Sequence, residues 1–283
     1  MDFKNPKVPE GINVSRHNPL LDLVLLTGGV VVGFAVLGLV LVYLGAWLAR
    51  YVPVSWEMAM ADGLVAEAEH GGDPAVRAAL QDLADRLSVH MDLPEGMTVT
   101  VHYLETDTVN AFATFGGHVF LFRGLIRHMP NENALAMVLA HEIAHAANRD
   151  PMTRLGGTLL LQLAVAVVLG SAPESMELLV SGPNALLMLG FSREDEADAD
   201  ADALAAVAEL YGHVAYAAEV FEIFLELAAE AGQDEPPEIL SSHPLNRSRI
   251  TAIAARAEAE GWPLDGDPTP LPPVLAALRD AQR

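Results

Sequence analysis

The chain of 283 residues contains no cysteine. This absence excludes disulfide bonds, cysteine nucleophiles and thiolate ligands, so any bound transition metal has to be held by histidine or carboxylate side chains. Basic residues are also scarce, because 16 lysines and arginines stand against 38 acidic residues and give a net charge of −22. Binding to a nucleic-acid backbone requires clustered cations, so we expect no nucleic-acid partner.

Charged residues make up only 19% of the chain and hydrophobic residues 52%. This composition is too apolar for a disordered protein, and the length suffices for one substantial core. The longest apolar stretch, from Leu23 to Ala49, has no charged residue. As a helix it would be roughly 40 Å long, enough to cross a bilayer with some tilt. A cleavable signal peptide has an apolar region of only about 7 to 15 residues, so we interpret the stretch as an uncleaved anchor.

The distribution of charge around this stretch predicts its orientation. Lys4, Lys7 and Arg16 precede it, whereas Arg50 is followed by several acidic residues. By the positive-inside rule the N-terminus is cytoplasmic and the rest of the chain lies outside the cytoplasm. We therefore expect four segments, namely a cytoplasmic segment 1–19, a transmembrane anchor 20–50, a main domain 51–262 and a proline-rich tail 263–283 with a short helix.

Residue patterns after the anchor predict a mainly α domain with a small β-sheet, an α+β fold. Residues 57–90 have the apolar spacing of helices, while 97–106 and 109–122 are β-rich, with Gly116 and Gly117 as a hairpin turn. Asn131 is an N-cap residue before a helix at 132–150. A second apolar stretch, 155–172, has borderline length for a membrane span.

The predicted helix at 132–150 contains the sequence His141-Glu142-Ile143-Ala144-His145. Two histidines four residues apart lie on one face of a helix, so both can reach a single zinc ion. Glu142 points elsewhere on the helix and can exchange a proton with a water molecule activated by the metal. Two ordinary surface histidines beside an acid are the alternative interpretation.

A zinc site of this kind needs a third protein ligand. The acidic run SREDEADADADALAAVAEL at 192–210 offers Glu196 and Asp200 on one face of a predicted helix; one can bind zinc while the other accepts a hydrogen bond from a ligating histidine. Asp198, Asp200, Asp202 and Glu209 also have the spacing of a calcium-binding loop, but Ala203 stands where that loop requires glycine. A solvated acidic helix face is a third alternative.

Several motifs in collinear order now carry a resemblance to a known family. They are HEIAH at 141–145, SREDEADAD at 192–200, SSHPLNRSRI at 241–250, and NAFA at 110–113 followed by GGHVFLFRGLI. With these motifs, the chain from about residue 95 to about residue 256 resembles the HtpX and CAAX prenyl protease type of zinc metallopeptidase, metallopeptidase family forty-eight.

The resemblance implies a zincin-like fold, one Zn²⁺ per chain and a role for each motif. It makes Glu196 the third ligand beside His141 and His145, and Asp200 the partner of a zinc-bound histidine. It places Asn110, Ala111, Phe112 and Ala113 on a strand edge that pairs with an extended substrate. By analogy His243 is a catalytic residue that donates to the oxyanion, and Arg249 pairs with the acidic helix.

Topology favours the members with a soluble, periplasmic, BepA-like catalytic domain. His145 and Glu196 have to meet at one metal, so an even number of spans separates them. The stretch 179–191 is interrupted by Pro183 and too short to cross. We therefore expect no span between the ligands, and we expect 155–172 to be a helix that is buried in the domain or lies near the membrane surface.

Together these observations predict a single-pass zinc endopeptidase of a bacterial inner membrane with a periplasmic or otherwise extracytoplasmic catalytic domain. Resemblance to quality-control members suggests unfolded or misassembled envelope proteins as substrates. The sequence does not indicate an oligomeric state. One alternative is a membrane-anchored peptide-binding or chaperone module without turnover, against which the intact Glu142 argues. Another is a zinc hydrolase that acts on something other than peptides.

Overall fold

The computed structural model describes residues 18–68, 72–170, 190–231, 237–243 and 247–280. Lys4, Lys7 and Arg16, on which the predicted orientation depends, lie outside the described residues. So does most of the apolar stretch at 179–191.

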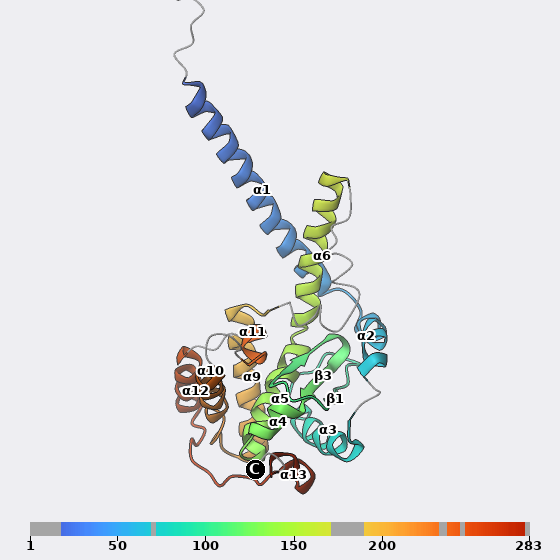
Figure 1. Cartoon of the computed structure of the whole chain (residues 1–283), viewed down its shortest axis with the longest axis vertical. Helices are drawn as coiled ribbons and strands as arrows, with labels where there is room; N and C mark the ends of the chain where they lie inside the picture. The colour runs from blue at the N-terminus through green and yellow to red at the C-terminus, as the bar shows by residue number, and fades with distance from the viewer. Residues whose placement is uncertain (1–17, 69–71, 171–189, 232–236, 244–246, 281–283) are drawn as a thin grey trace, which may run out of the picture.

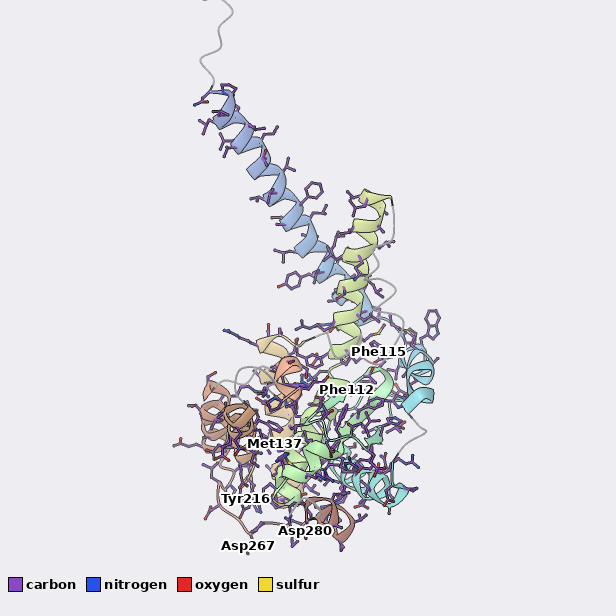
Figure 2. The ribbon with its side chains drawn as sticks, in the orientation of Figure 1. Phe112, Phe115, Met137, Tyr216, Asp267 and Asp280 are labelled. Atoms are coloured by element: carbon purple, nitrogen blue, oxygen red, sulfur yellow. The ribbon has the colours of Figure 1, made fainter. Side chains whose placement is uncertain are left out.

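Helix α1 (Pro19–Ala49) is the expected apolar helix, and it extends away from the rest of the molecule (Figure 1). The Asn18 side chain caps it by accepting a hydrogen bond from the Leu20 N–H at 3.1 Å. Figure 2 shows its side chains projecting on all sides, whereas the labelled Phe112 and Met137 lie within the domain. None of the residues in its most apolar window is buried, and its length and composition suffice to cross a membrane.

The sheet has three strands, β1 (Thr100–Leu104), β2 (Ala111–Ala113) and β3 (His118–Phe122), in the order β1-β3-β2. Strand β3 pairs in parallel with β1 and antiparallel with β2. The predicted hairpin is confirmed, and its turn includes a short 3-10 helix, η1 (Phe115–Gly117). Gly116 and Gly117 both have positive φ angles, 69° and 86°, a conformation that glycine adopts without strain.

Helices cover both faces of this sheet. Helices α3 (Pro74–Ser88) and α5 (Glu132–Ala147) pack on the face formed by Val101, Val119 and Leu121, which belongs to the main core. On the other face Phe112, Phe120 and Phe122 cluster with Val65 of helix α2 (Val54–Ala68). The alternation of the strand side chains thus builds two apolar layers, and α5 is held centrally in the larger one.

The remaining helices complete a mainly helical domain around the small sheet, so the predicted fold class is confirmed. They are α4 (Arg123–His128), α6 (Asp150–Leu169), α9 (Arg193–Tyr211), α10 (Glu219–Ala231), α11 (Ile239–Ser242), α12 (Arg247–Glu260) and α13 (Pro273–Asp280). Helix α13 is the short helix expected in the tail, and its fully buried Leu275 joins the main core.

For residues 155–172 we expected a helix that is buried in the domain or lies near the membrane surface, and helix α6 is buried only in part. Met152, Leu155 and Gly157 in its first half are buried, but Val167, Val168 and Leu169 at its end are 68–75% exposed. The helix leaves the domain beside α1 (Figure 1). It is a second helix whose length and apolar composition suffice to cross a membrane.

Candidate metal centre

Helix α5 carries the HEIAH sequence through the centre of the domain. Its predicted N-cap is confirmed, because the Asn131 Oδ1 accepts a hydrogen bond from the Ala134 N–H at 2.8 Å. Every residue from Glu132 to Ala146 is buried, including the fully buried Glu142 and His145. Packing on all sides fixes the direction in which both histidine rings leave the helix.

Each of the two histidines is oriented by a carboxylate at its Nδ1. The Nδ1 of His141 lies 3.0 Å from the Asp200 Oδ1, and the Nδ1 of His145 lies 2.8 Å from the Asp150 Oδ2. This arrangement turns both Nε2 atoms toward a common point, where they lie 3.1 Å apart. A carboxylate behind a ligating histidine fixes its tautomer and raises its basicity as a ligand.

Glu196 reaches the same point from helix α9. A capping box between Ser192 and Asp195 starts this helix, so Glu196 lies in its first turn and Asp200 one turn further on the same face. The Glu196 carboxylate lies 3.6 Å from the His141 Nε2 and 3.5 Å from the His145 Nε2. Asp198 and Asp202 are exposed on the helix rather than arranged in a loop, so the calcium-loop alternative is wrong.

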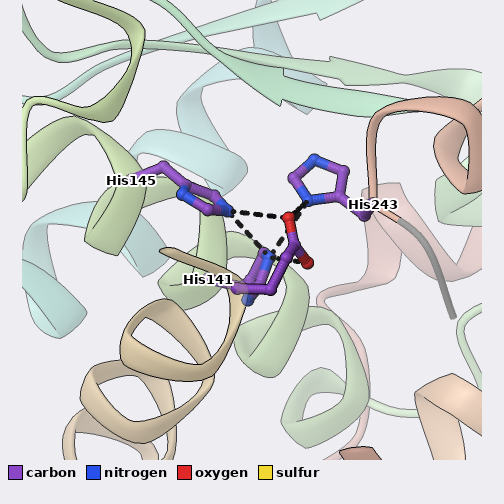
Figure 3. A group of neighbouring side chains, drawn as sticks. His141, His145 and His243 are labelled. Atoms are coloured by element: carbon purple, nitrogen blue, oxygen red, sulfur yellow. Dashed lines mark hydrogen bonds and ion pairs between the residues drawn. The ribbon is translucent and has the colours of Figure 1, made fainter. Parts of the chain in front are cut away.

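His243, at the end of α11, completes a group of four potential metal ligands. Its Nδ1 lies 2.8 Å from the Glu196 Oε1 and 3.2 Å from the His141 Nε2. Figure 3 shows the three labelled histidine rings around this carboxylate. The structure thus places His243 among the metal-binding atoms, and its Nε2 is 3.4 Å from the Glu142 Oε1. From the sequence we expected His243 to be a catalytic residue that donates to the oxyanion.

The geometry and charge of this group fit a divalent metal ion. One potential ligand atom from each of the four residues lies within 4.8 Å of the others, and tetrahedral coordination at about 2.0–2.1 Å separates ligand atoms by about 3.3 Å. Four buried carboxylates surround the histidines among the described residues: Arg249 pairs with Glu196 and Asp200, while Glu142 and Asp150 contact histidines. Buried anions require compensation, which a metal dication supplies.

The pKa values of the group reflect the same electrostatics. Burial alone would lower the pKa of His141, but Asp200 and Glu196 raise it to about 10. Burial likewise would raise the pKa of Glu196, but hydrogen bonds with His141, His145 and His243 hold that pKa well below its usual value. In the metal-free protein the carboxylates therefore retain a proton on His141, and metal binding has to release it.

Arg249 anchors the carboxylates, as the sequence predicted. Its guanidinium makes two parallel hydrogen bonds to Asp200, at 2.8 and 2.7 Å, and its Nη1 lies 2.6 Å from the Glu196 Oε2. Its other face lies over the ring of Phe221, with 4.8 Å from the Cζ to the ring centroid. Arg249 thus fixes the positions of Glu196 and Asp200 relative to α12.

Glu142 has the placement expected of a proton acceptor. It is fully buried, and neither of its carboxylate oxygens has a hydrogen-bond partner among the described residues. Native proteins rarely leave a buried carboxylate without such partners unless the site serves a function or holds a water molecule or an ion. The side chain is therefore available to water beside the metal-binding atoms.

Strand β2, which contains Ala111, Phe112 and Ala113, lies at an edge of the sheet. The backbone bonds Phe122 N–H to Asn110 O and Thr114 N–H to His118 O show that the peptide groups of Ala111 and Ala113 face away from β3. This edge is covered in the structure, because Ala111 is fully buried and the Ile239 N–H of α11 donates to Val109 O. Asn110 is also fully buried, and neither its Oδ1 nor its Nδ2 has a hydrogen-bond partner among the described residues.

The sequence analysis missed Asp150. Five residues after His145, it would face another side of a continuous helix. The chain turns at Arg149, whose φ of 58° is left-handed, and α6 then starts with Asp150 directed back at His145. The sequence pattern had made Asp150 the last residue of the helix 132–150, and nothing in it indicated this role.

Comparison with known proteins agrees with this geometry. The family model for peptidase family M48 matches residues 74–257, about two thirds of the chain. The beta-barrel assembly-enhancing protease of Yersinia pestis is 29% identical over 84% of this chain and 52% of its own length. Its namesake in Escherichia coli (strain K12) is 28% identical over 76% of this chain and 46% of its own length.

A eukaryotic relative shows the same kinship. The mitochondrial metalloendopeptidase OMA1 of Schizosaccharomyces pombe is 31% identical over 54% of this chain and 45% of its own length. The chain spans about half the length of these curated relatives. The match of the family model over most of the domain, together with the histidine and glutamate group, confirms the resemblance found in the sequence. The chain belongs to peptidase family M48, a family of metal-dependent peptidases.

Proposed function

We propose that the protein is a membrane-anchored zinc endopeptidase. The observation that carries this proposal is the buried group of His141, His145 and Glu196 beside Glu142, whose carboxylate oxygens lack hydrogen-bond partners among the described residues. Two histidines and one carboxylate are a ligand set that suits zinc in hydrolytic enzymes and leaves a position for water.

The proposed reaction assigns one task to each side chain. His141, His145 and Glu196 would hold a zinc ion, which would supply a Lewis acid for the peptide carbonyl and lower the pKa of water toward about 7. Glu142 takes a proton from the attacking water while the new C–O bond forms. It then gives that proton to the amine nitrogen as the C–N bond breaks. Asp150 and Asp200 hold the two imidazole rings in the orientation that this set requires.

His243 has to leave the metal-binding group for this reaction to proceed. Its Nδ1 now lies close to His141 and Glu196, where a bound metal would need room for water and the substrate carbonyl. Displaced by a short distance, the imidazole remains beside Glu142 and can donate to the oxyanion that develops on the carbonyl. We assign His243 this catalytic role.

A polypeptide substrate pairs with the edge of strand β2. The outward peptide groups of Ala111 and Ala113 offer backbone hydrogen bonds to an extended chain, and Asn110 and Phe112 flank them. Because α11 now covers this edge, it moves aside when substrate binds. The same segment carries His243, so one displacement would uncover the edge of β2 and also free the space beside His141 and Glu196.

The anchor gives the enzyme a location. We infer a single span by α1, a cytoplasmic segment 1–19 and an extracytoplasmic catalytic domain within residues 51–262, in a bacterial inner membrane. Two of the relatives are named as beta-barrel assembly-enhancing proteases. We therefore propose unfolded or misassembled envelope proteins as substrates.

The test is cleavage of casein, an unfolded polypeptide, by the full chain in detergent micelles at equal bound zinc. Wild type is compared with Glu142→Gln, which keeps the size of the side chain but cannot accept the proton. The control is Glu209→Gln, at an exposed glutamate of α9. Cleavage by wild type and the control, with loss in Glu142→Gln, supports the proposal. Equal cleavage by all three, or zinc binding without any cleavage of casein or of a denatured envelope protein, contradicts it, the latter in favour of a binding module.

A further inference from the structure

The end of helix α6 is an apolar surface that the proposed reaction does not use. We define the α6 tip as residues 163–169, after Gln162. Within it Leu163 is 52% exposed, Val167 75%, and Val168 and Leu169 both 68%. No charged residue follows Arg154 in this helix. A contiguous exposed patch of aliphatic side chains is uncommon on a protein surface that faces water, and it indicates a binding partner.

The α6 tip lies beside the helix that we place in the membrane. At the base of the pair the backbones nearly touch, since a Cβ atom on Gly45 would lie 2.3 Å from Gly156 O. Further along, a Cβ atom on Gly38 would lie 3.6 Å from the Cδ1 of Leu161. The order of these contacts shows that the two helices run antiparallel. Small residues at such a contact are typical of helix pairs in membranes.

The contacts also fix the level that the α6 tip reaches. Leu161 lies level with Gly38, and at 1.5 Å per residue Leu169 lies about 12 Å beyond it. That point is level with about residue 30 of α1, well inside the charge-free run, which ends at Leu23. If α1 crosses a bilayer, the tip reaches the hydrocarbon of the same bilayer.

Polar contacts at the base hold the two helices together. The Arg149 guanidinium donates to Arg50 O at 3.0 Å and to Val52 O at 2.7 Å, and it pairs with the buried Glu57 at 2.7 Å. These contacts tie the end of α1 to the start of α6. Helix α6 cannot swing away from α1 without straining these two hydrogen bonds, and the ion pair with Glu57 ties Arg149 to α2 as well.

We propose that the α6 tip inserts into the bilayer beside α1, with lipid acyl chains covering its exposed side chains. This inference rests on the proposed function only in requiring α1 to be embedded in the membrane. Helix α6 as a whole is long enough to cross, but its start is held in the domain, where Asp150 and Met152 are buried. The remaining charge-free part, residues 155–169, rises about 22 Å, which is short of the hydrocarbon thickness of about 30 Å. The tip therefore enters the membrane without crossing it, and both metal-binding segments stay on one side.

This insertion sets the height of the metal centre. Asp150, which orients His145, begins the same helix and lies 13 residues before Leu163, a rise of about 20 Å. Helix α6 thus acts as a rigid spacer between the bilayer surface and the site. Substrates are chain segments that come within about this distance of the membrane.

The absence of cysteine makes the test direct, because a single introduced cysteine is the only thiol. Full-length Val167→Cys is labelled with an environment-sensitive fluorophore and reconstituted into phosphatidylcholine vesicles whose acyl chains carry nitroxide quenchers. The matched controls are Val32→Cys in α1 and Val89→Cys in the domain, where the valine side chains are 61% and 81% exposed. Each variant is first checked for zinc binding equal to that of wild type.

We expect the label at residue 167 to lose most of its fluorescence, as at residue 32, while the label at residue 89 keeps it. Val168→Cys repeats the measurement at a second position of the tip. Quenching at 32 but not at 167 or 168 overturns the inference and leaves the anchor intact; the tip is then in water or covered by protein. No quenching at 32 shows instead that α1 is outside the bilayer, which removes the anchor of the proposed function as well.

Discussion

Helices α5 and α1 are both rich in apolar residues, but those of α5 are buried and most of those of α1 are exposed. In α5 every residue from Glu132 to Ala146 is buried, whereas in α1 only Gly45 and Ala49 are. In the domain, apolar packing supports α5 and allows buried polar groups to be positioned around it. In the stem, which we define as α1 with the second half of α6, the apolar side chains face outward and are exposed, which indicates a partner outside the domain.

The two regions therefore tolerate different changes. The domain depends on compensation of its buried charges and on tight packing, while the stem depends on its surroundings. Variants that separate these two requirements test the comparison, and we order them by the size of the expected effect.

The largest effect is expected for Arg249→Ala in the domain. The change leaves the buried Glu196 and Asp200 without their guanidinium and should lower the unfolding free energy by about 3–5 kcal/mol. Chemical unfolding of the metal-free full chain in detergent micelles measures it. Arg256→Ala is the control, because Arg256 is half exposed in an ion pair with Glu260 and should change stability by less than about 1 kcal/mol. Equal losses would show that the buried charges are not what distinguishes the domain.

The second expected effect is on metal affinity. Asp150→Asn removes the carboxylate that orients His145 and should weaken zinc binding about 10- to 100-fold, as measured by competition with a chelating dye. Asp198→Asn, at an exposed aspartate of α9, should leave the affinity unchanged. Unchanged affinity in Asp150→Asn would mean that the packing of α5 alone orients the ring.

The third prediction concerns pH and the sheet. Burial, with smaller contributions from His118 and Arg77, lowers the pKa of His102 to about 4, against about 6.5 when unfolded. Between these values the unfolded chain binds a proton that the folded chain does not. The free energy of unfolding therefore has its full value above about pH 6.5 and decreases as the pH is lowered. From about pH 7.5 to pH 5, wild type should lose about 2 kcal/mol more than His102→Gln. A difference near zero would show that His102 is protonated in the fold.

The smallest effect is expected in the stem. Val168→Ala should change the unfolding free energy of the full chain in micelles by no more than about 0.5 kcal/mol, because its side chain is 68% exposed. The matched change in the domain, Val207→Ala at a fully buried position of α9, should cost about 2 kcal/mol. Similar losses from both unfolding curves would mean that the α6 tip is packed against protein.

Much of the centre could be predicted because its features are local or repeat along one helix. The spacing of His141 and His145, the cap at Asn131 and the shared face of Glu196 and Asp200 follow from helical periodicity alone. The pairing of Arg249 with the acidic helix was implied by the family resemblance, and the contact with Asp200 confirms it. The Gly116-Gly117 turn followed from the conformations that glycine allows.

Other features depend on how separate segments meet. Asp150 reaches His145 only because the chain turns through a left-handed residue, and His243 joins the metal-binding atoms only because α11 lies along strand β2. For residues 155–172 the sequence left open a helix buried in the domain and one near the membrane surface, and the exposed end of helix α6 with its contact with α1 excludes burial along its whole length.

The sequence by itself determined which residues can bind a metal, which helix presents two of them, which stretch can cross a membrane and which family the motifs indicate. Helical periodicity, hydropathy and charge act over a few residues, and a linear pattern records them. The tertiary structure decided the positions of Asp150 and His243, the covering of the β2 edge and the direction of α6. These depend on distances between segments far apart in the chain, which are set by the packing of the whole domain.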